Sequence, residues 1–111
     1  MSEKAEILSE ASTFILLALA EPLHGYGIIK KVEQMSDGRV RLGPGTLYGA
    51  LTKMVKRGWI NPLPVENGER RKVYELTALG HEQLQSEMAR LTALVSYGEA
   101  ALLAWQQGRL S

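Results

Sequence analysis

The last third of the chain carries an apolar repeat that a small single domain cannot bury by itself. Alternating steps of four and three residues separate the positions Leu84, Met88, Leu91, Val95, Gly98, Leu102 and Trp105. A heptad repeat of this kind is typical of a helix that packs along its length against another helix. The spacing predicts a helix over residues 78–107, after Thr77, which suits the N-cap position. Because this helix would extend past the rest of the chain, we expect a second copy to cover its seam.

Length and composition exclude several classes of protein. The 111 residues point to one small folding unit, and the lack of cysteine excludes disulfides and thiolate chemistry. The N-terminal segment is acidic where a secretory signal would be basic, and the longest apolar run, Phe14 to Ala20, is far too short to span a membrane. We therefore expect a cytoplasmic protein that does not enter a membrane. The net charge of +1 says little about partners, but basic residues cluster locally.

Two helices and a short strand are predicted in the first part of the chain. Apolar residues at helical spacing predict a helix over residues 6–20, which Pro22 would end. A second helix is predicted over residues 26–35, with an apolar stripe that faces inward. His24 directly precedes it and suits the turn that starts the helix. Residues 39–42 alternate between polar and apolar, which indicates a very short strand.

A third helix is predicted over residues 44–57. Proline costs no hydrogen bond at the first helical position, so Pro44 suits the start of this helix. Gly58 fits the left-handed conformation that commonly ends a helix. The apolar residues of this segment fall on one stripe, made of Leu47, Leu51, Met54 and Val55.

A hairpin is predicted after the third helix. The dipeptide Asn67-Gly68 is a strong turn signal between two extended arms. The first arm contains Pro62 and Pro64, so it must be an edge strand or an irregular one. The second arm, residues 73–76, is rich in residues that favour strands.

Three helices followed by a hairpin is the order of a winged helix-turn-helix, whose third helix enters the major groove of DNA. We therefore predict a mainly α fold with a small β-hairpin, in which a winged helix-turn-helix DNA-binding domain (residues 1–77) precedes a C-terminal dimerisation helix (residues 78–111). The third helix turns small, polar and basic residues away from its apolar stripe. These candidate DNA contacts are Thr46, Tyr48, Gly49, Lys53 and Arg57, with Lys56 beside them.

The tip of the hairpin, "NGERRK", adds consecutive cations beside a turn. Such a wing typically lies along the DNA backbone or in the minor groove, where positive charge is favoured. Cations that neutralise phosphates give salt-dependent affinity without a choice of sequence. The candidate contacts in the wing are Asn67, Arg70, Arg71 and Lys72.

Three stretches together resemble the PadR-like family of winged-helix transcriptional regulators: "FILLALAEPLHGYGIIKKVE", "GPGTLYGALTKMVKRGWI" and "RRKVYELTALGHEQL". The resemblance implies a dimeric repressor or autoregulator whose DNA affinity often falls when a small aromatic or drug-like effector binds near the dimer interface. It places Tyr26, Thr46, Leu47 and Tyr48 at DNA-proximal positions of the family motif. Gly43 is a departure, since the family commonly has serine there and glycine caps a helix more weakly. The single C-terminal helix suits the short subfamily.

Trp105 has two interpretations, because an indole in the seam either packs there or offers a flat platform to an aromatic effector. Tyr97 and Met88 are weaker candidates for the same effector site. No metal site is expected, because His24 and His81 lie far apart and no cysteine accompanies them. We also expect no catalytic residues and no cofactor, since the chain has no nucleophile grouping, no phosphate-cradling loop and no paired carboxylates.

The sequence therefore predicts a homodimeric transcriptional repressor that binds a pseudo-palindromic double-stranded DNA operator and is released by a small hydrophobic or aromatic effector. Two alternatives stay open at this point. One is a winged-helix module that binds proteins and never contacts DNA. The other is a small-molecule carrier or enzyme that uses a cavity at the interface.

Overall fold

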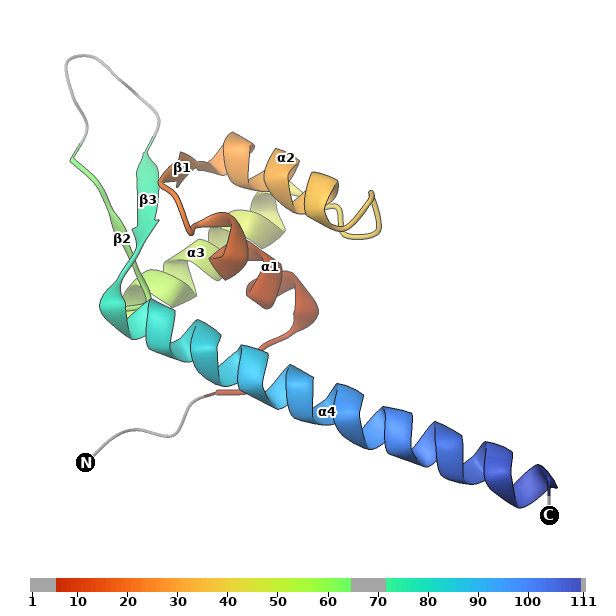
Figure 1. Cartoon of the computed structure of the whole chain (residues 1–111). Helices are drawn as coiled ribbons and strands as arrows, with labels where there is room; N and C mark the ends of the chain where they lie inside the picture. Colours follow the sequence, from red (N-terminus) through yellow and green to blue (C-terminus); the bar gives the residue numbers. More distant parts are fainter. Residues whose placement is uncertain (1–5, 65–71, 111) are drawn as a thin grey trace.

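The computed structural model describes residues 6–64 and 72–110, and its elements confirm the predicted fold class (Figure 1). Three short helices and a small antiparallel sheet form a winged helix-turn-helix, and one long helix follows. The elements are α1 (Glu10–Ala18), β1 (Leu23–His24), α2 (Gly25–Met35), α3 (Pro44–Lys56), β2 (Ile60–Pro62), β3 (Val73–Leu76) and α4 (Ala78–Leu110). Within the described ranges, no helix combines the length and the apolar composition that crossing a bilayer requires.

The sheet has three antiparallel strands, with β3 in the centre between β1 and β2. Tyr74 of β3 lies opposite Leu23 of β1 on one side and opposite Pro62 of β2 on the other. β2 is therefore an edge strand, as its proline predicted, because an edge position leaves the missing amide donor without consequence. The hairpin of β2 and β3 is the base of the wing, and the turn predicted at residues 67–68 lies outside the described residues.

The strand predicted at residues 39–42 is wrong. This segment is an irregular loop, and the third strand of the sheet is instead β1. The chain turns sharply after α2, where Gly38 adopts a positive φ of 77°. The Val40 amide then donates a hydrogen bond to the Ser36 hydroxyl at 2.9 Å, so it is satisfied locally and not by a neighbouring strand.

The first helix is shorter than the predicted range of residues 6–20. It begins at Glu10 because the Ser9 hydroxyl caps it, accepting a hydrogen bond from the Ser12 amide at 3.1 Å. The residues before this cap have no regular secondary structure and pass beside α4 (Figure 1). We call the segment Glu6–Ser9 the N-terminal arm.

The other helices begin and end close to the predicted positions. α2 starts at Gly25, and the Gly27 amide donates to His24 Nδ1 at 3.2 Å, which confirms that His24 shapes this turn. α3 starts at Pro44 and has Arg57 as its C-cap, followed by Gly58 with a φ of 76°. α4 continues past residue 107 to Leu110.

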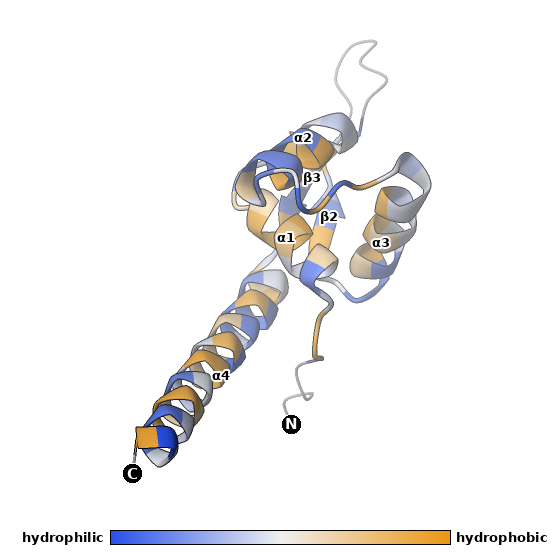
Figure 2. Cartoon of the chain, turned by 90° about the vertical axis from the view of Figure 1, so that its right-hand side faces the viewer, coloured by the Kyte–Doolittle hydropathy of each residue, from blue (hydrophilic) through white to orange (hydrophobic). Residues whose placement is uncertain are grey.

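One core joins the three short helices and the sheet, whose apolar faces turn toward each other (Figure 2). Trp59 closes this core beside the wing, since it is 7% exposed and its carbonyl accepts a hydrogen bond from the Thr77 amide at 2.9 Å. Thr77 also caps α4, because its hydroxyl accepts a hydrogen bond from the Gly80 amide at 3.0 Å. The largest fully buried side chains are Ile15, Leu16, Leu19, Ile28, Val32, Leu47, Leu51 and Ile60.

Gly80 sets how closely α4 approaches the wing. A Cβ atom at this position would lie 2.1 Å from the Trp59 carbonyl oxygen, so only glycine fits there without a backbone shift. The start of α4 is therefore packed directly against the winged helix.

The predicted seam of α4 divides into two parts. Leu84 packs against the core of its own chain, and Met88 is half-buried. Every residue from Leu91 to Leu110 is exposed, and this part of the helix projects away from the body (Figure 1). The apolar residues on the projecting part have no cover from the described part of the chain, and they include Leu91, Leu94, Val95, Leu102 and Trp105.

Candidate nucleic-acid interface

The outer face of α3 is exposed and carries polar, basic and small residues. Thr46, Gly49 and Lys53 are exposed on this face, while Leu47, Leu51 and Met54 are buried on the other. A Cβ atom added at Gly49 would meet no atom within 4 Å, so the helix backbone is open to an approaching surface there. This face therefore allows close contact with a large partner over two turns of helix.

The N-terminal end of α3 faces solvent with free backbone amides. Gly43 is the N-cap and makes no side-chain hydrogen bond to the first turn, and Pro44 follows at the first helical position. The first-turn amides of such a helix need an outside acceptor, and a phosphate oxygen suits them well. Thr46 lies in this first turn, beside those amides.

Tyr48 lies on one flank of this face, against the start of α2. A Cβ atom at Gly25 would lie 2.5 Å from the Tyr48 hydroxyl oxygen, so the glycine makes room for the tyrosine ring. Tyr48 is half exposed as a residue. Behind it, burial raises the pKa of Tyr74, and the nearby Tyr48 raises it further. Tyr74 is thus a core residue, whereas part of Tyr48 is accessible to a ligand.

Tyr26 comes from the start of α2 and is 63% exposed. Its ring stacks on the His24 ring with centroids 6.5 Å apart, and Lys30 Nζ lies 5.6 Å from the Tyr26 centroid. Lys30 therefore adds a cation beside Tyr26. The sequence signal for it is weak, because a lysine four residues after a tyrosine on an exposed helix face is common.

The base of the wing adjoins the same corner of the molecule. Val73 of β3 pairs with His24 of β1, so the preceding Lys72, which is exposed, lies near the start of α2. The fold thus brings the start of α2, the start of α3 and the wing base to one side. The predicted wing contacts Asn67, Arg70 and Arg71 lie outside the described residues.

Arg57 has partners within its own chain. Its Nε donates a hydrogen bond to the Glu6 carboxylate of the N-terminal arm, and its guanidinium lies 5.5 Å from the centroid of the Trp59 ring. It also lies about 90° around the helix axis from the middle of the exposed face, at the flank opposite Tyr48. A DNA contact by Arg57 stays a prediction, and it would have to compete with Glu6.

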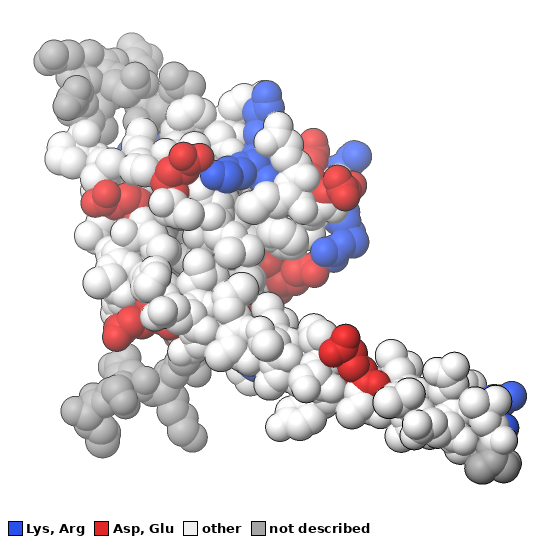
Figure 3. Space-filling model, viewed as in Figure 1, with Lys and Arg blue, Asp and Glu red and all other residues white. Residues whose placement is uncertain are grey.

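Charges differ between the two sides of the domain. On the side that Figure 3 shows, acidic and basic side chains mix around α2. Ion pairs there join Lys31 to Glu21 at 2.8 Å and Arg39 to Glu10 at 2.6 Å, and they hold the pKa of each glutamate below its ordinary value. Lys53 forms no ion pair with any described residue, and the same is true of Lys56 on the exposed face of α3. Their charge is therefore available to a partner.

The three predicted effector residues do not meet within one chain. Met88 and Tyr97 are nine residues apart on α4, which places them on nearly opposite sides of the helix. Trp105 is 64% exposed, and the Arg109 guanidinium lies 4.7 Å from the centroid of its ring. Any site that combines these side chains needs a second copy of the chain.

Known proteins resemble this chain in sequence and in fold. Residues 15–86 match the family described as the transcriptional regulator PadR-like family. The chain is 43% identical over 91 residues to a 37.1 kDa protein of a Streptomyces fradiae transposon, a match that covers 78% of this chain and only 25% of that relative. The chain thus spans about a quarter of the length of the curated relative that it matches.

Two solved structures share the fold over most of their length. A PadR family transcription regulator from Clostridium difficile is 24% identical with a TM-score of 0.71, covering 85% of this chain and 99% of that chain. A PadR-like transcription factor from Bacteroides fragilis is 26% identical with a TM-score of 0.67, covering 82% of this chain and 87% of that chain.

Proposed function

The chain belongs to the PadR-like family of transcriptional regulators, and from this premise we propose that it is a sequence-specific DNA-binding regulator that acts as a homodimeric repressor. The observation that carries this proposal is the outer face of α3, which is exposed, unpaired in charge and open to close approach at Gly49. Such a face suits the major groove, which is wide enough to admit one helix. The function is non-enzymatic, and it requires a cytoplasmic location where DNA is accessible.

We propose that the two α3 helices of a dimer enter successive major grooves on one side of the duplex. Two-fold symmetry of the protein then calls for a pseudo-palindromic operator with half-sites about 34 Å apart. Thr46 reads base edges from the first turn, while Lys53, Tyr26 and Tyr48 bind flanking phosphates. In this proposal residues 1–77 form the DNA-binding domain.

The wing contributes affinity without sequence choice, and its role can be measured through salt. Lys72→Ala is expected to weaken binding to any duplex and to flatten the dependence of affinity on salt by roughly one unit of slope per lost phosphate contact. Arg71→Ala, in the predicted wing tip, is expected to act in the same way. The measurement is a titration of labelled operator and of random duplex at several salt concentrations.

Thr46→Ala is the matched comparison for the wing variants. Because threonine carries no charge, its removal should leave the salt slope unchanged and reduce the preference for operator over random DNA. If all of these variants keep the wild-type affinity, slope and preference, the DNA-binding surface lies elsewhere or the chain does not bind DNA.

We propose that the dimer forms through α4, residues 78–111, and that an aromatic effector binds there. An antiparallel pair of α4 helices centred between residues 96 and 97 would set Met88 of one chain opposite Trp105 of the second, while Tyr97 would lie at the middle of the pair but on the side of α4 away from Met88. This arrangement would bring together side chains that one chain keeps apart. Effector binding releases DNA only if the effector prefers a dimer whose α3 helices no longer match the operator.

The effector proposal predicts coupled optical and binding responses. A planar hydrophobic ligand is expected to quench tryptophan fluorescence and to lower operator affinity, because an exposed indole offers a flat stacking surface. Trp105→Phe is the control, since the buried Trp59 supplies a constant background signal. If Trp105→Phe and Trp105→Ala keep the full ligand response, or if no aromatic compound competes with DNA, then Trp105 only packs in the interface.

A further inference from the structure

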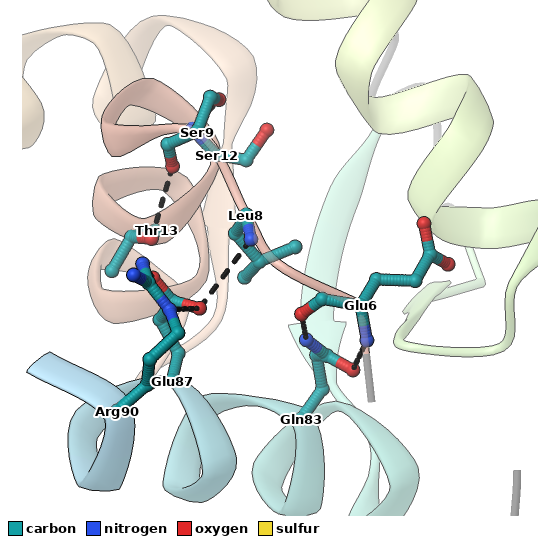
Figure 4. A network of polar contacts seen from close by, with 8 residues as sticks. All are labelled: Glu6, Leu8, Ser9, Ser12, Thr13, Gln83, Glu87 and Arg90. Atoms are coloured by element: carbon teal, nitrogen blue, oxygen red, sulfur yellow. Dashed lines mark hydrogen bonds and ion pairs between the residues drawn. The ribbon is translucent and has the colours of Figure 1, made fainter. Parts of the chain in front are cut away.

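The N-terminal arm is attached to α4 by hydrogen bonds (Figure 4). The Gln83 amide group makes two hydrogen bonds to the backbone of Glu6: its Nε2 donates to the Glu6 carbonyl at 2.7 Å, and its Oε1 accepts from the Glu6 amide at 3.3 Å. Gln83 is only 6% exposed. A buried amide that engages both the donor and the acceptor of one residue holds that residue in position as well as orientation.

A second contact follows one step further along the arm. The Leu8 amide donates to the Glu87 carboxylate at 3.4 Å, and Glu87 is 2% exposed. Arg90 pairs with the same carboxylate and donates a hydrogen bond to it. This bond from Arg90 holds the pKa of Glu87 below its ordinary value, whereas burial acts to raise that pKa. The ionised form of Glu87 is therefore favoured, and its carboxylate accepts from both Arg90 and the arm. Ile7, between the two contacts, is 77% exposed, whereas Leu8 is partly buried and packs against the core. Apolar packing therefore helps to hold the arm at Leu8, and hydrogen bonds hold it at Glu6.

Glu6 extends the contact from α4 to α3. While its backbone is held by Gln83 of α4, its carboxylate accepts the hydrogen bond from Arg57, the C-cap of α3. One residue thus touches both the helix proposed to read DNA and the helix proposed to form the dimer. At its other end the arm runs directly into the Ser9 cap of α1.

We propose that the N-terminal arm is a strap that fixes the direction of α4 relative to α3, with Gln83 and Glu6 as its positioning residues. The inference rests on the proposed function, because in a dimer joined through α4 this direction sets the distance and rotation between the two recognition helices. If the direction of α4 is fixed, the dimer strictly prefers one spacing of operator half-sites. If that direction varies, the same dimer can bind operators with several spacings.

The direction of α4 can be measured without DNA. The chain contains no cysteine, so Lys56→Cys on α3 and Gln106→Cys on α4 would accept spin labels at two defined points. Labelled chains diluted with excess unlabelled protein report the distance within one chain, whatever the oligomeric state. Gln83→Ala is expected to broaden this distance distribution about twofold, as local release of a tethered segment allows. Gln85→Ala, an exposed change two residues further along the same helix, is expected to leave the distribution unchanged.

The same variants then test the preference for one spacing of operator half-sites. Operator selected from random duplexes with the wild-type protein would be compared with a duplex that carries one extra base pair between half-sites. We expect wild type and Gln85→Ala to bind the altered duplex roughly tenfold more weakly, and Gln83→Ala to lose most of this preference while each half-site still binds. Glu6→Gln, which keeps the backbone contacts and changes only an exposed side chain, is expected to shift both measurements in the same direction by less.

Three results would overturn the strap. One is a distance distribution for Gln83→Ala that matches wild type. Another is an unchanged spacing preference in a variant whose dimer is intact. The last is a Glu6→Gln variant that binds every duplex more tightly with a steeper salt slope, since Glu6 would then act by masking Arg57. If the wild-type protein selects no DNA, the proposed function is contradicted and not the strap. The distance distribution of Gln83→Ala, measured without DNA, would still test the strap in that case.

Discussion

Leu91→Glu combined with Val95→Glu is expected to convert the protein from a dimer to a monomer at micromolar concentration. Both residues lie on the projecting part of α4, where they are 36% and 61% exposed in a single chain. Glutamate is tolerated at such positions in the monomer, because the carboxylate reaches water. In the proposed interface it becomes a buried charge without a partner, which costs about 3 kcal/mol or more per site.

The expected weakening of the dimer is on the order of a thousandfold or more, since two such sites act together and every 1.4 kcal/mol is about tenfold. Light scattering during size-exclusion chromatography would give the mass directly. Operator binding should fall with the dimer, because the second half-site then binds as an independent event and its effective concentration is lost.

The matched control is Ala89→Glu with Ala93→Glu. These residues are also exposed and four apart, but each lies two positions before a seam residue, which is about 200° around the helix. The same added charge on the other side of α4 should leave the dimer intact. The proposed interface would be contradicted by a wild-type protein that is monomeric at this concentration. It would also be contradicted if the variant with both Leu91→Glu and Val95→Glu remained dimeric.

The elements with strong local signals could be predicted from the sequence. α3 has a proline at its first position, an apolar stripe at helical spacing and a glycine after its end, and each feature depends only on neighbouring residues. The exposed positions of Thr46, Gly49 and Lys53 follow from the same periodicity, since fixing the buried face fixes the opposite one. The prediction for α4 succeeded for similar reasons, with Thr77 as its cap.

Elements that depend on distant partners could not be predicted. β1 has only two residues, Leu23 and His24, and it becomes a strand because β3 pairs with it from fifty residues away in the chain. Residues 39–42 alternate like a strand, but none of the strands in the described residues pairs with them. A short alternating run carries the same signal in both cases, and only the tertiary partner separates them.

The buried polar side chains of α4 could not be predicted either, because their partners lie in the distant N-terminal arm. Helical periodicity predicts that a face of α4 is apolar, yet two of its three buried residues are Gln83 and Glu87. Both side chains satisfy backbone groups of the arm from nearly eighty positions away, and Glu87 also pairs with Arg90. Arg57 was likewise assigned to DNA from its place on α3, because nothing in its neighbourhood signals that Glu6 lies beside it.

Gly49→Glu is expected to abolish operator binding while the protein becomes no less stable. A Cβ atom at this position meets nothing within 4 Å, so a larger side chain fits the free protein without strain. Glycine in the middle of a helix costs about 0.5–1 kcal/mol relative to alanine, so Gly49→Ala should raise the free energy of unfolding by a similar amount. Thermal or urea unfolding would measure this gain.

Binding should change in the opposite direction, because the helix backbone at Gly49 is where the proposed groove comes closest. Gly49→Ala is expected to weaken operator binding only slightly. Gly49→Gln adds bulk and should weaken it about tenfold, whereas Gly49→Glu adds the same bulk with a negative charge against the phosphates and should weaken it a hundredfold or more. The difference in operator affinity between Gly49→Gln and Gly49→Glu measures the effect of charge, because the two side chains have nearly the same size.

Gln85→Glu is the control for charge alone, since it places the same carboxylate at an exposed position of α4 instead of α3. It should bind the operator like wild type. Opposite signs for stability and binding in the Gly49 series cannot come from unfolding, which would lower both together. Equal operator affinity for wild type and Gly49→Glu would mean that α3 does not lie in the groove, and the DNA-binding surface would have to be sought on another face.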